Sequence, residues 1–492
     1  MIPPLPLPAT YPRLYLSRLP WIGLFVVIGL ALRLWHLSAP FWYDEVFSAS
    51  LSRLPLAQLW QAAAGDVHPP LYYFLLWGVN RLIGDSEMSL RLPSVLAGLA
   101  LIWVVDRMAI SLGMSDKAKW LAVGLVTLSP FQVYYSQEAR AYSLLMLVVS
   151  LAALALVNKR PVLLAGYSLV ALYLHHLAAP FVFTLLLLAI TTRRFSWPVL
   201  AGLITVIVVG YVPGTLLTLH QMANISGNYW IPPLNNPGRV IATLDDLIFF
   251  SPSSSFVISS GIITGLTLAL LTFDLSRFLD DPKPFVKLMV IVPLALVTLV
   301  SLVWQPILIS RVVAPVALFY YLWIADSLNQ SQRRLATWLT LATPVILAIL
   351  IIGPLMGQGR NDSKELYQSS FIKPGQAMYH ANVGSYLIWN WYRPDVEHWL
   401  WPHNGGLSES LSQQTKEAMR LRQASFEDIS CAHRQWWFVY FNNPTTSPEE
   451  IAYTQKIETD YPSERVVNLR SDSTVEAWLV KLSTDCSPQA AH

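Results

Sequence analysis

Two adjacent carboxylic acids, Asp44 and Glu45, follow the first apolar segment of the chain, which runs from Trp21 to Leu37. A carboxylate close to hydrocarbon is costly, so acids in such a place are usually kept for a purpose. Successive side chains point in different directions, so one acid can face a cavity while the other supports it through hydrogen bonds. The acid that faces the cavity would be partly desolvated, which raises its pKa and suits a general base that takes a proton from a hydroxyl or an amine. From spacing alone, a salt bridge to Arg53 or Arg91 explains the pair equally well.

A second polar group follows in the sequence Asp66-Val67-His68-Pro69-Pro70, with Tyr73 close behind it. Proline is well tolerated at the start of a helix, so the pair of prolines predicts that a helix begins here. His68 would then lie at the N-terminus of that helix, a natural place for an anion such as phosphate. Capping or packing is the alternative role for His68, and Asp66 has the alternative of an N-cap.

A third group contains Tyr135, Glu138 and Arg140, at the edge of a later apolar segment. The planar guanidinium of Arg140 is well suited to binding a phosphate, and an internal ion pair with Glu138 is the alternative. Arg311, at the start of another apolar segment, is a further phosphate-binding candidate, unless its side chain only reaches toward the membrane surface. The sequence offers no zinc motif, Gly-rich phosphate loop or nucleophile elbow, so no metal ligands are assigned. Use of a divalent metal stays open.

The composition bounds the setting in which these residues act. Hydrophobic residues make up 54% of the 492 residues and charged residues only 13%, whereas a soluble protein usually carries about 25% charge. We therefore expect an integral membrane protein surrounded by a lipid bilayer. The net charge of +3 is small and the basic residues are scattered, so no nucleic-acid partner is indicated.

Lysine and arginine in the short loops orient the chain, because such residues gather on the cytoplasmic side. They predict a cytoplasmic N-terminus and a multi-pass protein of the cell (inner or plasma) membrane. The segment 69–84 is too short and too polar to span, so we expect a helix lying in the membrane interface. The first outer loop then covers residues 39–89 and carries the first two polar groups. About eleven spans are expected, near 21–38, 91–111, 118–135, 140–157, 161–177, 179–192, 197–216, 256–275, 285–303, 311–327 and 335–356.

The character of the chain changes after Gly357, where polar residues replace the apolar runs. We therefore expect a membrane domain over residues 1–357 and an extracytoplasmic domain over 358–492. The second should be a small α/β domain, with strands near 376–379, 436–441 and 475–482 and helices near 384–392 and 409–422. Its two cysteines, Cys431 and Cys486, either form a disulfide or remain as thiols.

Four sequence motifs, taken together and in order, resemble those of a known class. They are Trp42-Tyr43-Asp44-Glu45, Asp66-Val67-His68-Pro69-Pro70-Leu71-Tyr72-Tyr73, Ser89-Leu90-Arg91-Leu92-Pro93-Ser94 and Tyr135-Ser136-Gln137-Glu138-Ala139-Arg140-Ala141-Tyr142. The chain resembles the GT-C class of polytopic glycosyltransferases. Within that class it is most similar to the bacterial branch related to protein O-mannosyltransferases and lipid A aminoarabinose transferases.

The resemblance implies that Asp44 is the catalytic acid of the first outer loop, with Glu45 beside it. It also implies a polyprenyl-phosphate sugar donor and inversion at the anomeric carbon, and we expect an acceptor in the cell envelope. Arg140, with His68 and Arg311, would bind the donor phosphate. The expected supporting or acceptor-binding residues are Asp66, Tyr73, Tyr135 and Glu138. Relatives of the aminoarabinose type often have a lysine where this chain has His68.

Two other functions compete with this interpretation. A transporter or flippase of lipid-linked sugars would place acids deep within its spans and would show related halves. A non-catalytic envelope scaffold would tolerate the loss of Asp44.

Overall fold

The structure is a computed structural model, and it describes residues 19–223, 231–249 except 232 and 237, 284–330, 372–402, 411–442 except 434, 463–470 and 474–481, with isolated positions between 452 and 459. The chain divides into two compact units. Unit 1 combines Met1–Leu37, Arg91–Thr218 and Ile231–Gln358, and unit 2 combines Ser38–Leu90, Leu219–Trp230 and Gly359–His492. Each unit is therefore built from stretches that are far apart in the sequence.

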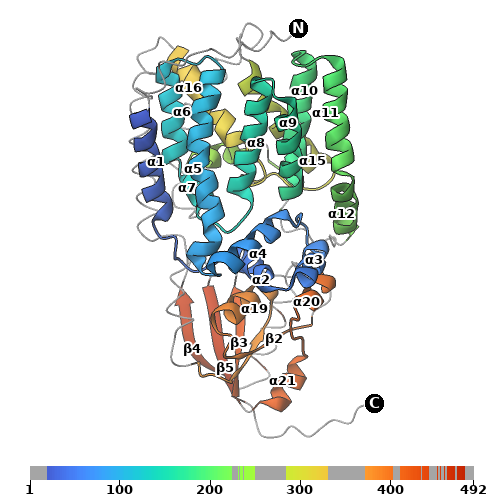
Figure 1. The fold of residues 1–492 in the computed structure, drawn as a ribbon. Helices are drawn as coiled ribbons and strands as arrows, with labels where there is room; N and C mark the ends of the chain where they lie inside the picture. The colour runs from blue at the N-terminus through green and yellow to red at the C-terminus, as the bar shows by residue number, and fades with distance from the viewer. Residues whose placement is uncertain are drawn as a thin grey trace. The chain divides into compact units, whose positions relative to one another are not determined.

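Unit 1 is a bundle of apolar helices (Figure 1). Most of its helices begin at a proline or a polar cap, as at Ser115 before α6 and Pro161 in α9. Its described helices are α1 (Leu19–Leu34), most of α5 (Glu87–Ser111), α6 (Asp116–Leu128), α7 (Pro130–Ser136), α8 (Tyr142–Val157), α9 (Pro161–Leu174), η1 (His176–Ala178), α10 (Ala179–Thr191), α11 (Trp197–Gly210), most of α12 (Val212–Ala223), α13 (Gly238–Phe249), α15 (Pro284–Val303) and α16 (Val316–Gln330).

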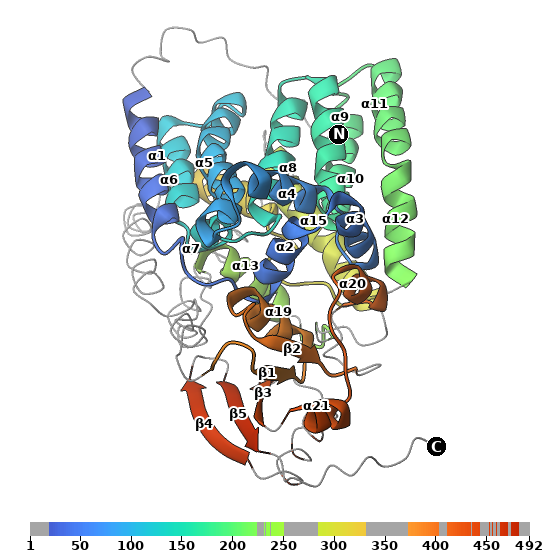
Figure 2. The same cartoon turned by 60° about the horizontal axis from the view of Figure 1, so that its bottom comes forward.

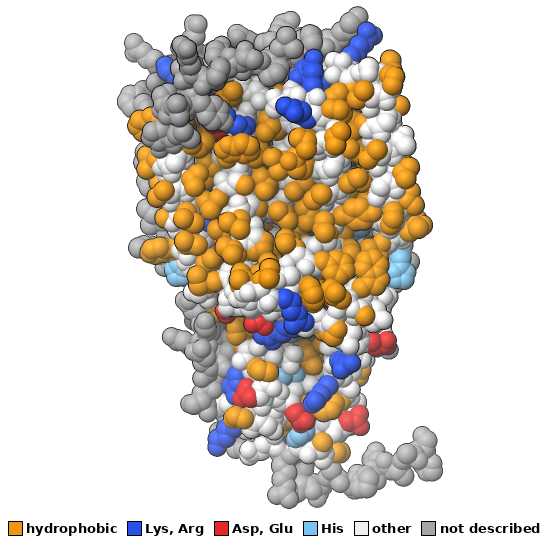
Figure 3. All heavy atoms as spheres, viewed as in Figure 1, with side chains coloured by type: hydrophobic (Ala, Val, Ile, Leu, Met, Phe, Trp, Pro, Cys, Tyr) orange, Lys and Arg blue, Asp and Glu red, His pale blue; other side chains and the backbone are white. Residues whose placement is uncertain are grey.

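Three stretches of helix are long and apolar enough to cross a membrane within the described part of the chain. They are Glu87–Ser111, Trp197–Met222 and Pro284–Val303, and four shorter apolar helices lie at Trp21–Leu34, Tyr142–Val157, Pro161–Leu174 and His176–Thr191. Hydrophobic side chains cover the visible face of these helices almost continuously, and lysine and arginine gather at one end of them (Figure 3). This is the surface expected of helices that contact lipid.

The segment predicted as one span over 118–135 is instead two helices, so that prediction is wrong in its extent. α6 ends at Leu128, and Ser129 caps the short α7, with its Oγ accepting a hydrogen bond from the N–H of Gln132 at 3.4 Å. Pro130 has no N–H to continue the helix, which explains the break. The predicted spans at 256–275 and 335–356 lie outside the described residues, so the total of eleven stays a prediction.

The first loop contributes three helices to unit 2. They are α2 (Tyr43–Arg53), α3 (Leu56–Gly65) and α4 (Leu71–Ile83). α4 confirms the helix predicted over 69–84, whereas α2 and α3 were not predicted. Prolines separate the three helices, because Pro55 precedes α3 and Pro70 precedes α4.

The C-terminal part of unit 2 contains a five-stranded sheet in the order β2-β1-β3-β5-β4 (Figure 2). β1 runs parallel to β2 and β3, and β5 runs antiparallel to β3 and β4. The elements are β1 (Ala377–His380), α19 (Val383–Tyr392), β2 (Glu397–Leu400), α20 (Gln413–Ala418), α21 (Phe426–Ala432), β3 (Gln435–Asn442), β4 (Ser463–Arg470) and β5 (Thr474–Lys481). The predicted α/β character is confirmed, although the helix expected over 409–422 is much shorter.

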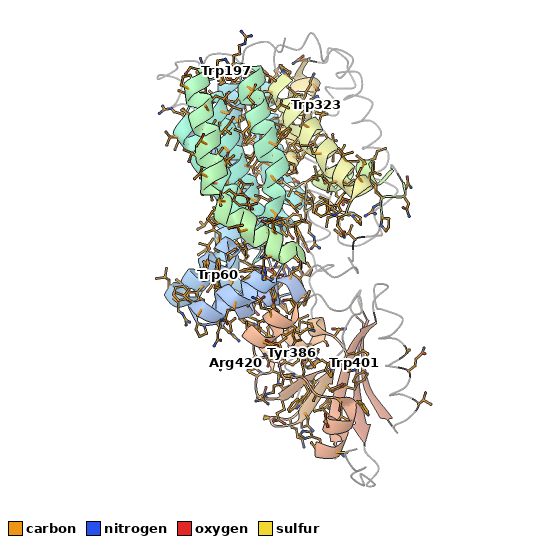
Figure 4. All side chains as sticks on the ribbon, turned by 90° about the vertical axis from the view of Figure 1, so that its right-hand side faces the viewer. Trp60, Trp197, Trp323, Tyr386, Trp401 and Arg420 are labelled. Atoms are coloured by element: carbon orange, nitrogen blue, oxygen red, sulfur yellow. The ribbon has the colours of Figure 1, made fainter. Side chains whose placement is uncertain are left out.

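Alternation along the strands gives this sheet two different faces. On one face Tyr379, Trp436 and Phe438 pack with residues of α21 in a hydrophobic core. On the other face two buried histidines on neighbouring strands meet, His380 on β1 and His398 on β2, with 2.9 Å between His380 Nε2 and His398 Nδ1. Tyr386 of α19, labelled in Figure 4, packs edge-on against His380.

The hydrogen bonds around the two histidines fix their protons. His398 Nε2 lies 2.8 Å from the carbonyl of Arg393, which can only accept, so Nε2 carries the proton and Nδ1 accepts one from His380. His380 Nδ1 then faces the hydroxyl of Ser385 at 3.1 Å. Burial lowers the pKa of both rings, to about 4 for His398 and well below the usual value for His380. A proton added to His398 Nδ1 would set its N–H against the N–H of His380 inside the sheet.

We therefore expect this domain to lose stability as the pH falls from about 6.5 to 4. The unfolded chain binds these protons near pH 6.5 and the folded chain does not, so stability falls over that window, by on the order of 3 kcal/mol for His398. Tryptophan fluorescence during thermal unfolding at pH 7, 6, 5 and 4.5 would measure the loss. His398→Gln, which keeps one donor and one acceptor, should flatten the dependence.

His433→Gln is the matched control, because His433 is a partly exposed histidine in the same domain that contacts Glu397. A pH dependence that survives unchanged in His398→Gln would contradict the assignment to the buried pair.

Candidate functional site

The two acids of the first loop lie in the first turn of α2, and they differ in burial. Glu45 is fully buried, and its Oε2 accepts a hydrogen bond from the backbone N–H of Trp42 at 3.4 Å, which caps the helix. Asp44 is half-buried, and its backbone carbonyl accepts from the hydroxyl of Ser48 at 3.0 Å. One acid therefore supports the turn from inside while the other keeps a partly accessible carboxylate.

α19 of the C-terminal domain holds this turn in place. The hydroxyl of Tyr392 accepts from the backbone N–H of Phe41 at 2.7 Å and donates to Glu87 at 3.1 Å. Trp391 packs edge-on against the ring of Phe41, with 5.7 Å between the centroids. The chain just before Asp44 is thus fixed by residues about 350 positions later.

Arg53, at the end of α2, is not a partner for the acid pair. Its guanidinium lies 3.3 Å from the centre of the Trp391 ring, and its Nε is 2.6 Å from Asp85. The predicted alternative of a salt bridge between the acids and Arg53 is therefore wrong, because Arg53 serves to join α2 to α19 and to the end of the loop.

Asp66, His68 and Tyr73 come together in the turn between α3 and α4. One oxygen of the buried Asp66 accepts from the Tyr73 hydroxyl at 2.8 Å and from His68 Nδ1 at 3.0 Å. Burial alone would raise the pKa of Asp66, but the charge and hydrogen bond of His68, with bonds from Val67 and Tyr73, hold it below its ordinary value. Asp66 is therefore ionised and orients His68. It ends α3 rather than capping α4, so the predicted alternative of an N-cap is wrong.

Gln221, from the end of α12, closes the same turn. Its side-chain amide donates to the carbonyls of Ala63 and His68, both at 2.9 Å. The ring of Tyr73 meets Phe47 of α2 edge-on, with 5.8 Å between centroids, and thereby joins the Asp66 turn to the helix of Asp44. Within unit 2, packing thus links two of the three polar groups predicted from the sequence.

The third group lies in unit 1, where Tyr135, Glu138 and Arg140 are all buried. The Tyr135 hydroxyl bonds to the side chain of Ser310, and both Glu138 and Arg311 lie within electrostatic range of it. The guanidinium of Arg140 lies 6.0 Å from the centre of the Tyr142 ring, which packs edge-on against Tyr135. Tyr135 therefore lies close to Glu138 and to Arg311, and Arg140 is linked to it through Tyr142. Guanidinium and hydroxyl groups can donate hydrogen bonds to a phosphate, whereas an ionised Glu138 can only accept them.

Two reciprocal caps position this segment. The guanidinium of the fully buried Arg33, in α1, donates to the carbonyls of Val126 and Thr127 at the end of α6 and to Ser136 in α7. The side-chain amide of Gln137 donates back to carbonyls at the end of α1, the shortest being 2.6 Å to Trp35. The last carbonyls of a helix have no partners within the helix, so each side chain satisfies the end of another helix.

No group of three or more histidine, cysteine, aspartate or glutamate side chains close enough to hold a metal ion occurs among the described residues. Cys431 is exposed, and Cys486 lies outside the described residues, so their pairing stays open.

Known proteins with a similar fold were found by comparison of sequence and structure. Residues 67–214 match the family model of dolichyl-phosphate-mannose-protein mannosyltransferases, which is less than half of the chain. The crystal structure of ArnT from Cupriavidus metallidurans in the apo state superposes with a TM-score of 0.61 at 15% identity, covering 96% of this chain and 100% of that one. The same enzyme bound to undecaprenyl phosphate gives 0.58 at 13% identity, with 96% and 99% covered. No curated protein matches the sequence.

The chain resembles the GT-C glycosyltransferases. Because the likeness to ArnT extends over nearly the whole of both chains, the C-terminal domain shares in it as well as the helices. The family model begins at Val67, directly beside His68, and includes the Tyr135–Arg140 segment.

Several positioning residues were missed from the sequence. Arg33, Gln221 and Tyr392 each act on a backbone group more than 90 positions away, and local patterns carry no such information. A signal did exist for Gln137, because it lies inside the Tyr135–Tyr142 motif. Another existed for Arg33, since a cation within an apolar helix needs a partner.

Gly98 of α5 should be intolerant of any side chain. A Cβ there would come 2.8 Å from Arg33 Nε and closer still to Ser136 Oγ. Gly98→Ala should therefore lower the stability by about 1–3 kcal/mol, measured as the midpoint of thermal unfolding in detergent. Gly166→Ala, in α9 with nothing within 4 Å of its Cβ, is the matched control and should be neutral or slightly stabilising. Equal effects of the two substitutions would contradict the packing described.

Removing one hydroxyl tests the hold of α19 on the Asp44 turn. Tyr392→Phe takes away the acceptor for Phe41 and the donor to Glu87, so we expect faster hydrogen exchange at the start of α2 while the sheet keeps its protection. Hydrogen exchange with mass spectrometry resolves the two regions. Tyr167→Phe, in α9, is the control. Unchanged exchange around residues 40–46 would show that the bond does not hold the turn.

Proposed function

We propose that this protein is a membrane glycosyltransferase that moves a sugar from a polyprenyl-phosphate donor to an extracytoplasmic acceptor, which is a lipid, a glycan or a protein. The observation that carries the proposal is the contrast between Asp44 and Glu45, one half-buried and the other fully buried as a cap. The likeness in fold to ArnT, which has been crystallised with undecaprenyl phosphate, supports the class of donor.

The proposed reaction is a single displacement with inversion at the anomeric carbon. The acceptor oxygen or nitrogen attacks the anomeric carbon from the face opposite the phosphate, and its proton passes to the Asp44 carboxylate. The bond between the anomeric carbon and the phosphate oxygen breaks, and its electron pair leaves with the polyprenyl phosphate. Glu45 keeps Asp44 in position through the first turn of α2. Such general-base assistance typically contributes a factor of about 10²–10⁴ to the rate.

The residues proposed to bind the departing phosphate are Arg140, Arg311 and His68. A planar guanidinium can donate two parallel hydrogen bonds to phosphate oxygens, and preorganised positive charge is often a large part of catalysis. His68 Nδ1 donates to the ionised Asp66, which orients the ring. Tyr73, Tyr135 and Glu138 are proposed to support these groups.

The proposed orientation places the N-terminus in the cytoplasm and the C-terminal domain outside, in a multi-pass protein of the cell membrane. Its support is that the basic turns between α5 and α6, α8 and α9, and α10 and α11 lie at the same end of the unit 1 helices (Figure 1). Basic residues in short loops favour the cytoplasmic side.

The decisive variant is Asp44→Asn, which keeps the shape of the side chain and removes its basicity. We expect transfer from a polyprenyl-phosphate sugar to fall by about 10²–10⁴, with donor binding retained. Transfer is measured with radiolabelled donor and an envelope extract as acceptor.

Asp85→Asn is the control in the same loop, because Asp85 lies in an exposed pair with Arg53 that contributes little to stability. If Asp44→Asn keeps wild-type transfer, Asp44 is not the base. If neither the wild type nor the variant transfers any sugar while donor still binds, a transport or scaffold role replaces the enzymatic one.

A further inference from the structure

A polar cavity of about 490 Å³ lies in unit 2, between α3 of the first loop and α20 of the C-terminal domain. This volume falls within the range of about 300–1,000 Å³ that is usual for small-molecule sites. Nothing in the proposed mechanism uses it. Its lining consists of three glutamines, a glutamate, an arginine and one alanine, namely Gln58, Gln61, Gln414, Glu417, Arg420 and Ala418.

The two walls are held together by specific contacts. Thr415 donates to the carbonyl of Ala62 at 2.9 Å, and the amide of Gln414 donates to the carbonyl of Gln61 at 3.0 Å. Gly65 makes the close approach feasible, because a Cβ there would come 2.6 Å from Ser412 Oγ and 2.7 Å from Thr415 Oγ1. The two walls are therefore joined by hydrogen bonds, and the cavity between them is open to solvent, since most of its lining side chains are exposed.

Arg420 occupies a backbone position that normally favours glycine. Its φ is +57°, just after the end of α20, where the N–H of Leu421 returns to the carbonyl of Lys416 at 3.0 Å. Glycine would adopt this conformation without strain, whereas arginine brings a guanidinium to the rim of the cavity (Figure 4 labels Arg420).

The chemistry of the lining selects among ligands. Each glutamine amide offers both donors and an acceptor, while Glu417 only accepts and Arg420 only donates. Glu417 and Arg420 carry opposite charges, so the cavity is neutral overall. Glu417 would repel an anion, and Arg420 would repel a cation. An apolar ligand would leave the amides without partners, which is costly. A neutral molecule rich in hydroxyl groups satisfies every lining group.

We propose that this cavity binds a neutral oligosaccharide. Its walls include α3, the helix that directly follows the helix of Asp44, so the bound saccharide would be part of a glycan acceptor. That last step rests on the proposed function, whereas saccharide binding itself does not.

The test uses the full-length protein in a detergent without a sugar headgroup, because maltoside detergents would compete. Saturation-transfer NMR with maltose, cellobiose and N,N′-diacetylchitobiose should show binding of at least one of them. Gln58→Ala combined with Gln61→Ala should weaken it at least tenfold, because neither side chain holds the walls together. Arg420→Gly, whose backbone suits the positive φ and so preserves the fold, should also weaken it. Gln330→Ala, an exposed amide on α16, is the matched control and should bind as the wild type does.

Binding by none of the disaccharides, or undiminished binding by both cavity variants, would overturn the proposal. So would preferential binding of inorganic phosphate that is lost in Arg420→Gly, since it would mark an anion site. Asp44→Asn separates this proposal from the catalytic one. If the wild-type protein binds the saccharide but transfers no sugar, the cavity is a glycan site in a protein that is not a transferase.

Discussion

A buried cation with neutral oxygen partners organises one end of unit 1. The break at Pro130 leaves the last carbonyls of α6 without partners in the helix, and the guanidinium of Arg33 satisfies two of them. The negative end of a helix dipole favours a positive charge at this position. The side-chain amide of Gln137 in turn donates to the carbonyl of Trp35 at the end of α1. α1 therefore holds the end of α6 through Arg33, and the segment after α7 holds the end of α1 through Gln137. Each contact depends on carbonyls that are left without partners where the other helix ends.

This arrangement explains why the residues Tyr135 to Arg140 occur as a compact motif. Ser136 and Gln137 dock the segment on α1, and the neighbouring Tyr135 lies within electrostatic range of Glu138 and Arg311. Arg91 completes the frame by donating to the carbonyl of Leu37 at 2.7 Å, where the chain leaves unit 1. Residues that fix the backbone thus lie next to Arg140, one of the residues proposed to bind a phosphate.

Sequence patterns predicted the elements that have strong periodicity and the residues that form clusters in the sequence. β1, β3, β5, α4 and α19 were found because alternating or amphipathic runs mark them. α2 and α3 were missed because each has only about three turns between prolines, and β2 and β4 were not predicted either. The roles of Asp66 and Tyr392 could not be predicted from the sequence. The bond between Asp66 and His68 depends on the shape of a turn, and the bond between Tyr392 and Phe41 depends on how distant elements pack.

The hold of α19 on the Asp44 turn also has a consequence for biosynthesis. Phe41 and Tyr392 are separated by 351 positions in the chain, and ribosomes add about 5–20 residues per second. The first loop must therefore wait on the order of half a minute after its own synthesis for the segment that braces it. During that interval the acids of α2 lack their C-terminal support. The first loop is completed only when nearly the whole polypeptide has been made and inserted.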